Sequence, residues 1–597
     1  MTADLHDGAS QSAAATAPGQ PTDAPARRAA TTAPADADRR AGARIRPALV
    51  LAVLLSVAAS VRLGLLLLEW PASNSDEATT GLMAMHIAEG RHAPVFMYGQ
   101  SYMGTAQAFL AAVSFRAFGP SLIALRLPML LLFLLFLALV YVLGRRLYGT
   151  PVALTSVALL TLGSREQLGY ELIAQGAVPE TLVGGALLLL LAHRLLEVSG
   201  DPGRGAAQRG LLAAWGAMAS AGLWSTALVA PFVVTSAVLV LMTLRRQSAK
   251  RLRSVPALVA GLVAGAVPWI LHDASQPWRD SGLVSVVNLF LRGGTGLNGQ
   301  SSGLGSQVAN TLTTSLAYAT GGSAIAHPRS LPAWPFGYSA SWQPPTDDVV
   351  AALWGVALVA LWTTALLTNV RALRRGGRAT RQQSAGSLAL ANTCGRLAML
   401  GSAGLTVVAF AASPAPGIAP ANNVRYIIGA LVAVPAVIAP LWGMDSAMPR
   451  IGRPLRVLSL TVVGLALAVG TVQAYSDAAR GPSEAAGRQV LESLRARGIT
   501  HVYSGYFDCG RLIFLSEEQV TCAVVYADST GRLRPGFDRY PRYRAEVWGD
   551  AAAGYVFRAD DPRNRTLHDS GCSWRSRWSV AGYEVWQPAG RCEITQP

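Results

Sequence analysis

The sequence predicts a mainly α-helical, polytopic membrane protein with a small C-terminal α/β domain. Of its 597 residues, 51% are hydrophobic and only 14% are charged, which is too apolar for a set of soluble domains. Apolar runs long enough to cross about 30 Å of hydrocarbon recur along the chain. About eleven such runs, spread over residues 45–475, define the predicted membrane domain.

The basic residues are distributed as orientation signals. The net charge is +16, and all 50 basic residues except Lys250 are arginine. They form short clusters between apolar runs rather than a groove with interleaved aromatic residues, which argues against nucleic-acid binding. The preference for arginine is typical of a bacterium with GC-rich codons. We therefore expect a multi-pass protein of a bacterial plasma membrane.

The N-terminal region is a tail followed by a first span. Residues 1–44 are rich in Ala, Pro, Thr, Asp and Arg and hold too few large apolar residues to fold, so we expect a disordered tail. An apolar run follows over 45–68, interrupted only by Arg62. The preceding segment is too long for a signal peptide, which favours an uncleaved first span with a cytoplasmic N-terminus.

A first outer loop is expected over residues 69–121. Its segments Ala78 to Glu89 and Tyr102 to Phe118 predict amphipathic helices lying along the membrane surface. The second span, 122–143, ends in Arg145 and Arg146, which should be cytoplasmic. The loop before this span should then lie outside.

Nine further spans continue the alternation. The arginine clusters between them fall on one side of the membrane, so an odd total places the C-terminus outside. The expected ranges are 151–168, 181–196, 211–226, 227–244, 255–271, 349–369, 397–412, 426–444 and 457–475.

Two large outer segments are predicted. Residues 273–348 are far longer than an ordinary connection, which is typical of a lid or binding loop. Residues 476–597 predict an extracytoplasmic α/β domain with a helix over 483–497 and strands near 499–503 and 519–526. Its four cysteines allow three pairings, and the shortest loops favour Cys509 with Cys522 and Cys572 with Cys592. Cys394 is expected to be a small buried residue.

The acidic pair Asp76-Glu77 in the first outer loop is the leading candidate for chemistry. Either acid could remove the proton of an acceptor hydroxyl, an effect worth about a hundredfold to ten-thousandfold in rate. The alternative is structural, since Asn74, Ser75 or Asp76 could cap the helix that follows.

Several short motifs follow this acidic pair in a fixed order, and with them the sequence resembles the GT-C membrane glycosyltransferases. The similar branch is the family 39-like one, which includes protein O-mannosyltransferases and lipid A aminoarabinose transferases. The resemblance covers 45–444 and rests on Asp76-Glu77, Pro94, Gly99-Gln100-Ser101-Tyr102, Phe118-Gly119-Pro120-Ser121, Ala124 to Pro128, Gly149, Val178 to Leu182, Pro268-Trp269 and Arg425-Tyr426.

The resemblance implies transfer of a sugar from a polyprenyl-phosphate donor to a glycan, lipid or protein acceptor outside the cytoplasm. By match, Asp76 takes the role of general base, with Glu77 beside it. The chain departs from the family pattern in lacking the aromatic residue that often follows the acid. It also has almost no lysine, so recognition of the phosphate must rest on arginine.

Further candidates lie at the predicted outer ends of spans. Arg126 and Arg425 could bind the donor phosphate or merely snorkel. Glu171 and Glu180 could bind sugar hydroxyls, and Glu171 with Asp76 could hold a divalent cation, although acids in such positions more often cap helices. No cofactor other than such a metal is expected. The remaining substrate-binding candidates are Tyr98, Gln100, Tyr102, His272 and Tyr426.

The sequence leaves two other classes of protein open. A transporter or flippase of a lipid-linked glycan should place charged residues in mid-span, where only Arg62 lies. A membrane-anchored binding protein would use the C-terminal domain, in which no catalytic motif is visible.

Overall fold

The computed structural model describes residues 46–199, 202–246, 251–282, 284–285, 287–288, 303–326, 349–379, 384–480, 484–529, 531–590 and 592. The predicted tail 1–44 lies outside these residues, as do parts of the predicted outer loop 273–348.

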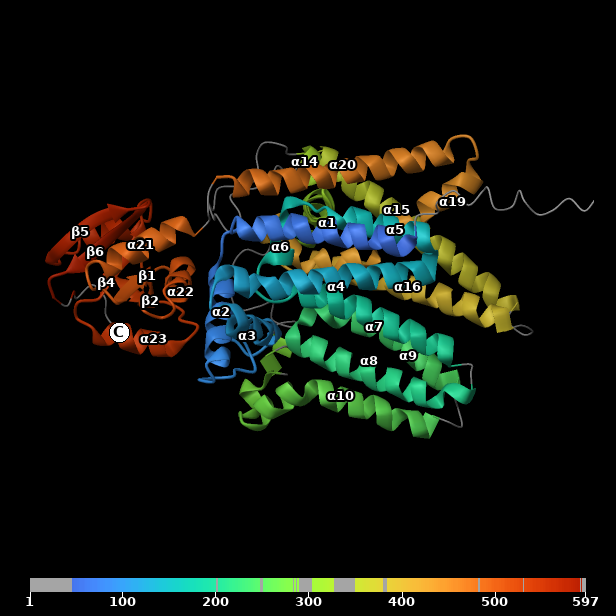
Figure 1. Ribbon diagram of the computed structural model, residues 1–597, viewed down its shortest axis with the longest axis horizontal. Coiled ribbons are helices and arrows are strands. Elements are labelled where there is room, and N and C mark those ends of the chain that lie inside the picture. The colour runs from blue at the N-terminus through green and yellow to red at the C-terminus, as the bar shows by residue number, and fades with distance from the viewer. Residues whose placement is uncertain are drawn as a thin grey trace, which may run out of the picture. The chain divides into compact units, whose positions relative to one another are not determined.

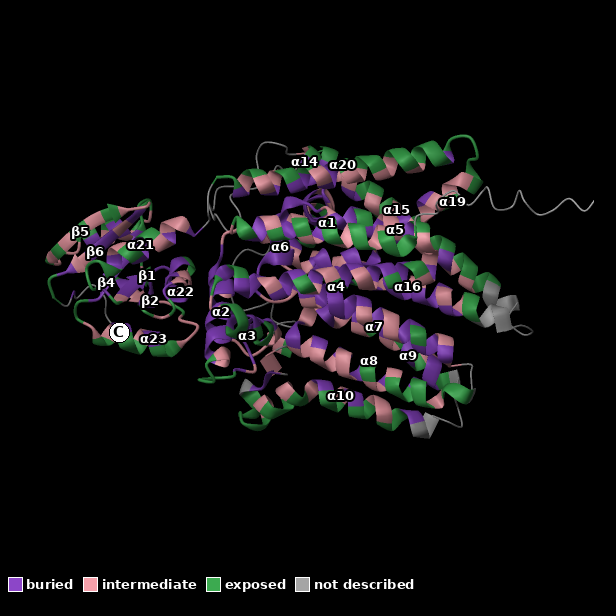
Figure 2. Cartoon of the chain, in the orientation of Figure 1, coloured by how far each residue is buried: buried purple, intermediate pink, exposed green. Residues whose placement is uncertain are grey.

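Most of the chain is helical, as predicted (Figure 1). Nine segments of the described chain are long and apolar enough to cross a membrane. Peripheral helices expose apolar side chains, whereas central helices are largely buried (Figure 2). The nine segments are α1 (Pro47–Leu67), α4 (Leu122–Tyr148), α7 (Val178–Val198), α9 (Ala230–Arg246), α10 (Arg251–Ala274), α15 (Val349–Ala379), α16 (Ser384–Ala411), the broken stretch Ile428–Ala447 and α20 (Gly452–Ala478).

Two of the eleven expected spans differ from this set. The run 151–168 is not one helix: α5 (Thr150–Thr161) ends after 12 residues, and α6 (Arg165–Leu172) follows. Ser164 caps α6 by accepting a hydrogen bond from the backbone N–H of Gln167 at 3.0 Å, so the chain turns at this point. The run 211–226 is part of α8 (Gly205–Ser225), which packs beside α7 and α10 but is not among the nine apolar segments.

The penultimate apolar segment is broken into short pieces. Pro435 and Pro440 interrupt it, because proline lacks the N–H that a continuous helix requires. The pieces are η6 (Asn422–Tyr426), η7 (Ile428–Ala433), α18 (Val434–Ile438) and α19 (Pro440–Ala447). The described part of the large loop also contains short helices, which are η4 (Trp278–Asp280), α12 (Leu304–Asn310), η5 (Thr311–Ser315), α13 (Leu316–Thr320) and α14 (Ser323–Ala326).

The first outer loop contains two helices, but one is not placed as the sequence predicts. Helix α3 (Ala106–Phe118) exposes an apolar face that includes Phe109, Val113 and Phe118, as expected of a helix at a membrane surface. Helix α2 (Ser75–Ala88) is instead buried along almost its whole length. Its prediction as a surface helix is wrong, because part of the C-terminal region covers it.

The C-terminal region forms the predicted α/β domain. Six strands make one sheet in the order β3-β2-β1-β4-β6-β5, in which β1 runs parallel to both β2 and β4. The strands are β1 (His501–Ser504), β2 (Thr521–Ala527), β3 (Leu533–Pro535), β4 (Gly554–Arg558), β5 (Trp574–Val580) and β6 (Tyr583–Pro588). The helices are α21 (Ala485–Arg495), α22 (Tyr506–Leu515), α23 (Pro541–Gly549) and α24 (Arg563–His568). Both predicted disulfides, Cys509–Cys522 and Cys572–Cys592, are present, and Cys394 is buried and belongs to neither of them.

Helices α2 and α22 meet closely. Residues of both helices, among them Phe514 of α22, belong to one hydrophobic cluster that also includes Phe115 of α3. A Cβ atom added at Gly81 would lie 2.5 Å from the ring of Phe514, so only glycine permits this approach. The contact explains why the face of α2 away from the membrane helices is also buried.

Glu518 reinforces this contact through charged hydrogen bonds. Its carboxylate accepts from His86 Nε2 at 2.9 Å, from the Tyr543 hydroxyl at 2.6 Å and from Arg91. Burial alone would raise the pKa of Glu518, but these donors outweigh it and lower the pKa to about 2. The carboxylate therefore stabilises the folded protein above its ordinary pKa of 4.5, and this contribution is lost as the pH falls toward 2.

We predict that Glu518→Gln lowers the stability of the full-length protein at pH 7 by about 1 to 2 kcal/mol. The deficit relative to wild type should shrink as the pH falls below 4.5, since the wild-type carboxylate is then itself being protonated. Thermal unfolding of both proteins in detergent at pH 7 and at pH 3.5 measures this difference. Equal melting temperatures at pH 7 would contradict the prediction.

Candidate active site

The polar residues at the N-terminus of α2 have different roles. Asn74 caps the helix, since its side-chain Oδ1 accepts from the N–H of Glu77 at 2.8 Å and its Nδ2 donates to Gln175 at 2.7 Å. Asp76 is the second residue of the helix, and its side chain is 27% exposed. The capping role considered for Asp76 therefore belongs to Asn74.

The side chain of Asp76 meets two residues of the C-terminal domain. Its Oδ1 accepts from Arg539 Nη2 at 2.5 Å and from the hydroxyl of Tyr506 at 3.5 Å. Arg539 also donates through Nε to the Tyr506 hydroxyl at 3.0 Å and through Nη1 to the backbone oxygen of Tyr98 at 3.3 Å. Asp76 is thus a partly exposed carboxylate in a polar setting.

Two of the other sequence candidates, Tyr102 and Arg425, interact electrostatically with Asp76, and a third, Tyr426, is hydrogen-bonded to Arg425. Burial raises the pKa of the Tyr102 hydroxyl, on which the charges of Arg539, Asp76 and Arg425 also act. Burial alone would lower the pKa of Arg425, but Tyr426 and Asp76 outweigh it and raise the pKa. The structure therefore brings Asp76, Tyr102, Arg425 and Tyr426 together. At neutral pH, Tyr102 is a neutral hydroxyl and Arg425 is a cation.

Arg425 has unused hydrogen-bonding capacity. Its Nη2 donates to the Tyr426 hydroxyl at 2.8 Å, and its guanidinium lies 4.8 Å from the centre of that ring. No carboxylate of the described chain lies within salt-bridge distance of Arg425. A guanidinium has five N–H donors, so most of those of Arg425 are available to an anion.

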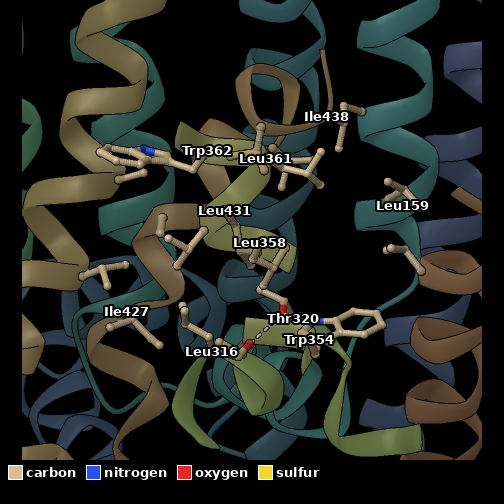
Figure 3. A pocket seen from close by; sticks show the side chains of 18 of the residues that line it. Leu159, Leu316, Thr320, Trp354, Leu358, Leu361, Trp362, Ile427, Leu431 and Ile438 are labelled. Atoms are coloured by element: carbon tan, nitrogen blue, oxygen red, sulfur yellow. Dashed lines mark hydrogen bonds between the residues drawn. The ribbon is translucent and has the colours of Figure 1, made fainter. Parts of the chain in front are cut away.

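An apolar cavity of about 300 Å³ lies among the membrane helices (Figure 3). Ile427, which follows Tyr426 in the chain, lines one part of it. Figure 3 shows the side chains of Leu358, Leu431 and Trp354 around the space. The indole of Trp354 donates to Thr320 Oγ1 at 2.8 Å, which satisfies the polar atoms of this wall. The rest of the lining is apolar except for Gln167 and Ser459.

Glu77, the second acid of the pair, does not face this cluster. Its carboxylate is fully buried and accepts from Arg126 through Nε at 2.8 Å and Nη2 at 2.6 Å, and from the N–H of Ala174 at 2.9 Å. Arg126 is only 1% exposed. The pair ties α2 to α4, so the structure argues against Glu77 as a base and against Arg126 as a phosphate ligand.

Glu171 is also held in a buried ion pair, with Arg62 of α1. Arg62 donates to Glu171 Oε2 through Nε at 3.1 Å and Nη2 at 2.8 Å. Its Nη1 and Nη2 also donate to the last carbonyl oxygens of α5, those of Thr161 at 2.7 Å and Leu160 at 3.2 Å. The lone arginine of the first span therefore caps the short helix α5 and neutralises Glu171.

The remaining candidates serve packing contacts. Glu180 accepts from Gln107 at 2.7 Å, which ties α7 to α3. The hydroxyl of Tyr98 bonds to His86 at 2.6 Å, and its ring stacks on Tyr540. Gln100 donates to the sulfur of Met97, and His272 lies edge-on against Phe96. Within the described residues, none of these four side chains is hydrogen-bonded to Asp76.

The described residues offer no cluster suited to a metal ion. No group of three or more His, Cys, Asp or Glu side chains lies together in this part of the chain. Glu171, which the sequence suggested as a partner of Asp76 in such a site, forms an ion pair with Arg62.

Sequence reasoning missed Arg539 and Tyr506. They lie more than 400 positions beyond Asp76, and neither belongs to a motif that resembles the family. The only local signal is an arginine between aromatic residues in Phe537-Asp538-Arg539-Tyr540.

No protein-family model and no curated protein sequence matches the chain. Among solved structures, ArnT from Cupriavidus metallidurans bound to undecaprenyl phosphate is 14% identical with a TM-score of 0.52, and the match covers 92% of this chain and 99% of ArnT. ArnT in the apo state is 15% identical with a TM-score of 0.53, over 92% and 98% of the two chains. The oligosaccharyltransferase AglB from Archaeoglobus fulgidus gives a TM-score of 0.45 at 13% identity, over 90% of this chain and 74% of AglB. The chain therefore has the fold of the two ArnT structures, in agreement with the fold that the sequence resemblance predicted.

Proposed function

We propose that this protein is a membrane glycosyltransferase that moves a sugar from a polyprenyl-phosphate donor to an acceptor on the outer face of the membrane. The observation that carries the proposal is the electrostatic interaction of Asp76 with Arg425 and Tyr102, together with the apolar cavity that Ile427 lines two residues beyond Arg425. A lipid-linked sugar phosphate has the same three parts, since it joins a polar sugar to an anionic group and an apolar chain.

Asp76 acts as the general base in this proposal. Its carboxylate takes the proton of the acceptor hydroxyl while the hydroxyl oxygen forms a bond to the anomeric carbon of the sugar. The bond from that carbon to the phosphate oxygen breaks, and the electron pair leaves with the polyprenyl phosphate. The partial exposure of Asp76 leaves room for an acceptor that arrives from water.

Arg425 binds the donor phosphate. The phosphodiester carries one negative charge, and the departing phosphate gains a second, which a guanidinium with free donors stabilises. Tyr102, whose pKa is raised by burial, keeps its proton and can donate to the sugar or the phosphate. The 300 Å³ cavity next to Ile427 suits the first isoprenoid units of the carrier. The undecaprenyl phosphate bound to the ArnT of similar fold supports a carrier of this class.

The positions of arginine residues along two membrane helices support a location of the Asp76 site outside the cytoplasm. Helix α4 carries Arg126 in its second turn and Arg145 and Arg146 in its last turn, about 30 Å further along at 1.5 Å per residue. Helix α20 likewise has Arg453 and Arg456 in its first turns and leads into the C-terminal domain at its other end. By the positive-inside rule, these arginine residues support an Asp76 site and a C-terminal domain outside the cytoplasm.

Binding of undecaprenyl phosphate to the purified full-length protein tests this proposal. We expect wild type to bind it and Arg425→Gln to bind about tenfold to hundredfold more weakly, because hydrogen bonds to the charged group are lost. Arg480→Gln is the matched control, since Arg480 is 77% exposed at the end of α20. Failure of wild type to bind the lipid, or equal binding by Arg425→Gln, would contradict the proposal.

A further inference from the structure

The two residues that precede Arg539 are both fixed by contacts with other parts of the chain. Asp538, which precedes it, accepts from the N–H of Val524 at 2.8 Å and from Arg544 Nε at 2.6 Å. Phe537 lies so close to Gly99 that a Cβ atom there would be 2.7 Å from its ring, and Gly99 has φ +75°. Arg539 is therefore held over the first outer loop by the C-terminal domain itself, and its side chain is 15% exposed.

Arg539 still has donors to spare. Of the five N–H groups of its guanidinium, one each is directed at Tyr506, Tyr98 and Asp76, which leaves two for another acceptor. Burial alone would lower the pKa of Arg539, but Asp76 and Tyr506 outweigh it and raise the pKa. The guanidinium is thus a permanent cation at the edge of the site.

The formal charges of the site balance only when an anion is present. Asp76 supplies one negative charge, whereas Arg425 and Arg539 supply two positive charges, so one positive charge remains in excess. A phosphodiester, with a single negative charge, matches that excess. Resting on the function proposed above, we propose that Arg539 of the C-terminal domain is a second phosphate-binding catalytic residue, which transfers its charge from Asp76 to the leaving phosphate.

The reaction requires such a transfer. When the acceptor hydroxyl gives its proton to Asp76, the carboxylate becomes neutral, and the cleaved phosphate gains one negative charge. The total charge of the site is unchanged, but one negative charge has moved from Asp76 to the phosphate. Arg539 already contacts Asp76, so loss of that charge releases its guanidinium for the phosphate.

The test measures the affinity of the full-length protein for undecaprenyl phosphate. This lipid is a suitable probe because its phosphate has the same charge as the leaving group of the proposed reaction. We expect Arg539→Gln to weaken binding about tenfold to hundredfold and Arg539→Lys to recover part of the loss. Arg534→Gln is the control, since Arg534 lies on β3 of the same domain and pairs with Asp528. Melting temperatures of all variants verify that the proteins compared are folded.

The substitution Asp76→Asn should change the affinity for undecaprenyl phosphate in the opposite direction. It removes the negative charge that competes for Arg539, so we expect it to bind undecaprenyl phosphate several-fold more tightly than wild type. That gain should disappear in the double variant Asp76→Asn/Arg539→Gln. If Arg539 has a purely structural role, the gain should persist in the double variant.

The outcomes separate this inference from the proposed function. If wild type binds undecaprenyl phosphate and Arg539→Gln binds it equally well, Arg539 is not a phosphate ligand. Faster sugar transfer by Arg539→Gln would also overturn the inference, because Arg539 would then restrain Asp76. If wild type does not bind the lipid at all, the proposed function itself fails.

Discussion

Asp76→Asn should reduce sugar transfer by two to four orders of magnitude, equivalent to about 3 to 5 kcal/mol of transition-state stabilisation. Folding should be unaffected, because Asn74 caps α2 and the asparagine at position 76 can still accept a hydrogen bond from Arg539. The substitution therefore removes the basic carboxylate and little else. Transfer from a radiolabelled polyprenyl-phosphate sugar, measured in membranes with matched amounts of protein, checks the effect.

Asn74→Ala is the matched control for this experiment. It removes the observed cap of the same helix and should cost about 1 kcal/mol of stability, with far less effect on transfer than Asp76→Asn. Near-normal transfer by Asp76→Asn would show that another group takes the proton.

Glu77→Gln should act on folding rather than on chemistry. Loss of the carboxylate leaves the guanidinium of Arg126 buried without a counter-charge, which typically costs about 3 to 5 kcal/mol. The melting temperature of the purified variant should fall sharply. The protein that remains folded should keep its Asp76 and its transfer activity per folded molecule.

Two variants sharpen this prediction. Glu89→Gln removes an acid just beyond the same helix, but Glu89 is 47% exposed and should be nearly neutral. The double variant Glu77→Met/Arg126→Met removes both charges and should be more stable than Glu77→Gln. Full stability of Glu77→Gln combined with a large loss of transfer would contradict the structural role and return Glu77 to the list of bases.

Much of the membrane fold could be predicted from the sequence, because length and hydropathy set the spans locally. The run 151–168 was an exception, since Arg62 from a different helix caps its carbonyl oxygens at Thr161. The two disulfides were also predictable, since short loops favour local pairing. Arg425 and Tyr102 were found through the family resemblance, and the structure places both near Asp76.

The contacts made by distant parts of the chain could not be predicted. Helix α2 has the composition of a surface helix, and its burial depends on α22, which lies more than 400 residues away. Arg539 and Tyr506 could not be predicted for the same reason, since each lies more than 400 residues from Asp76 in the sequence. Glu77 and Asp76 are adjacent in sequence, but successive helical residues point in directions about 100° apart, so one acid enters the core and the other faces the site.

A density map of the full-length protein with undecaprenyl phosphate bound is the most direct measurement of the proposed site. The phosphate should lie within hydrogen-bond distance of the Arg425 guanidinium, with Asp76 facing the side from which an acceptor approaches. The first isoprenoid units should occupy the cavity that Ile427 lines. A phosphate bound away from both Arg425 and Asp76 would contradict the proposed catalytic arrangement.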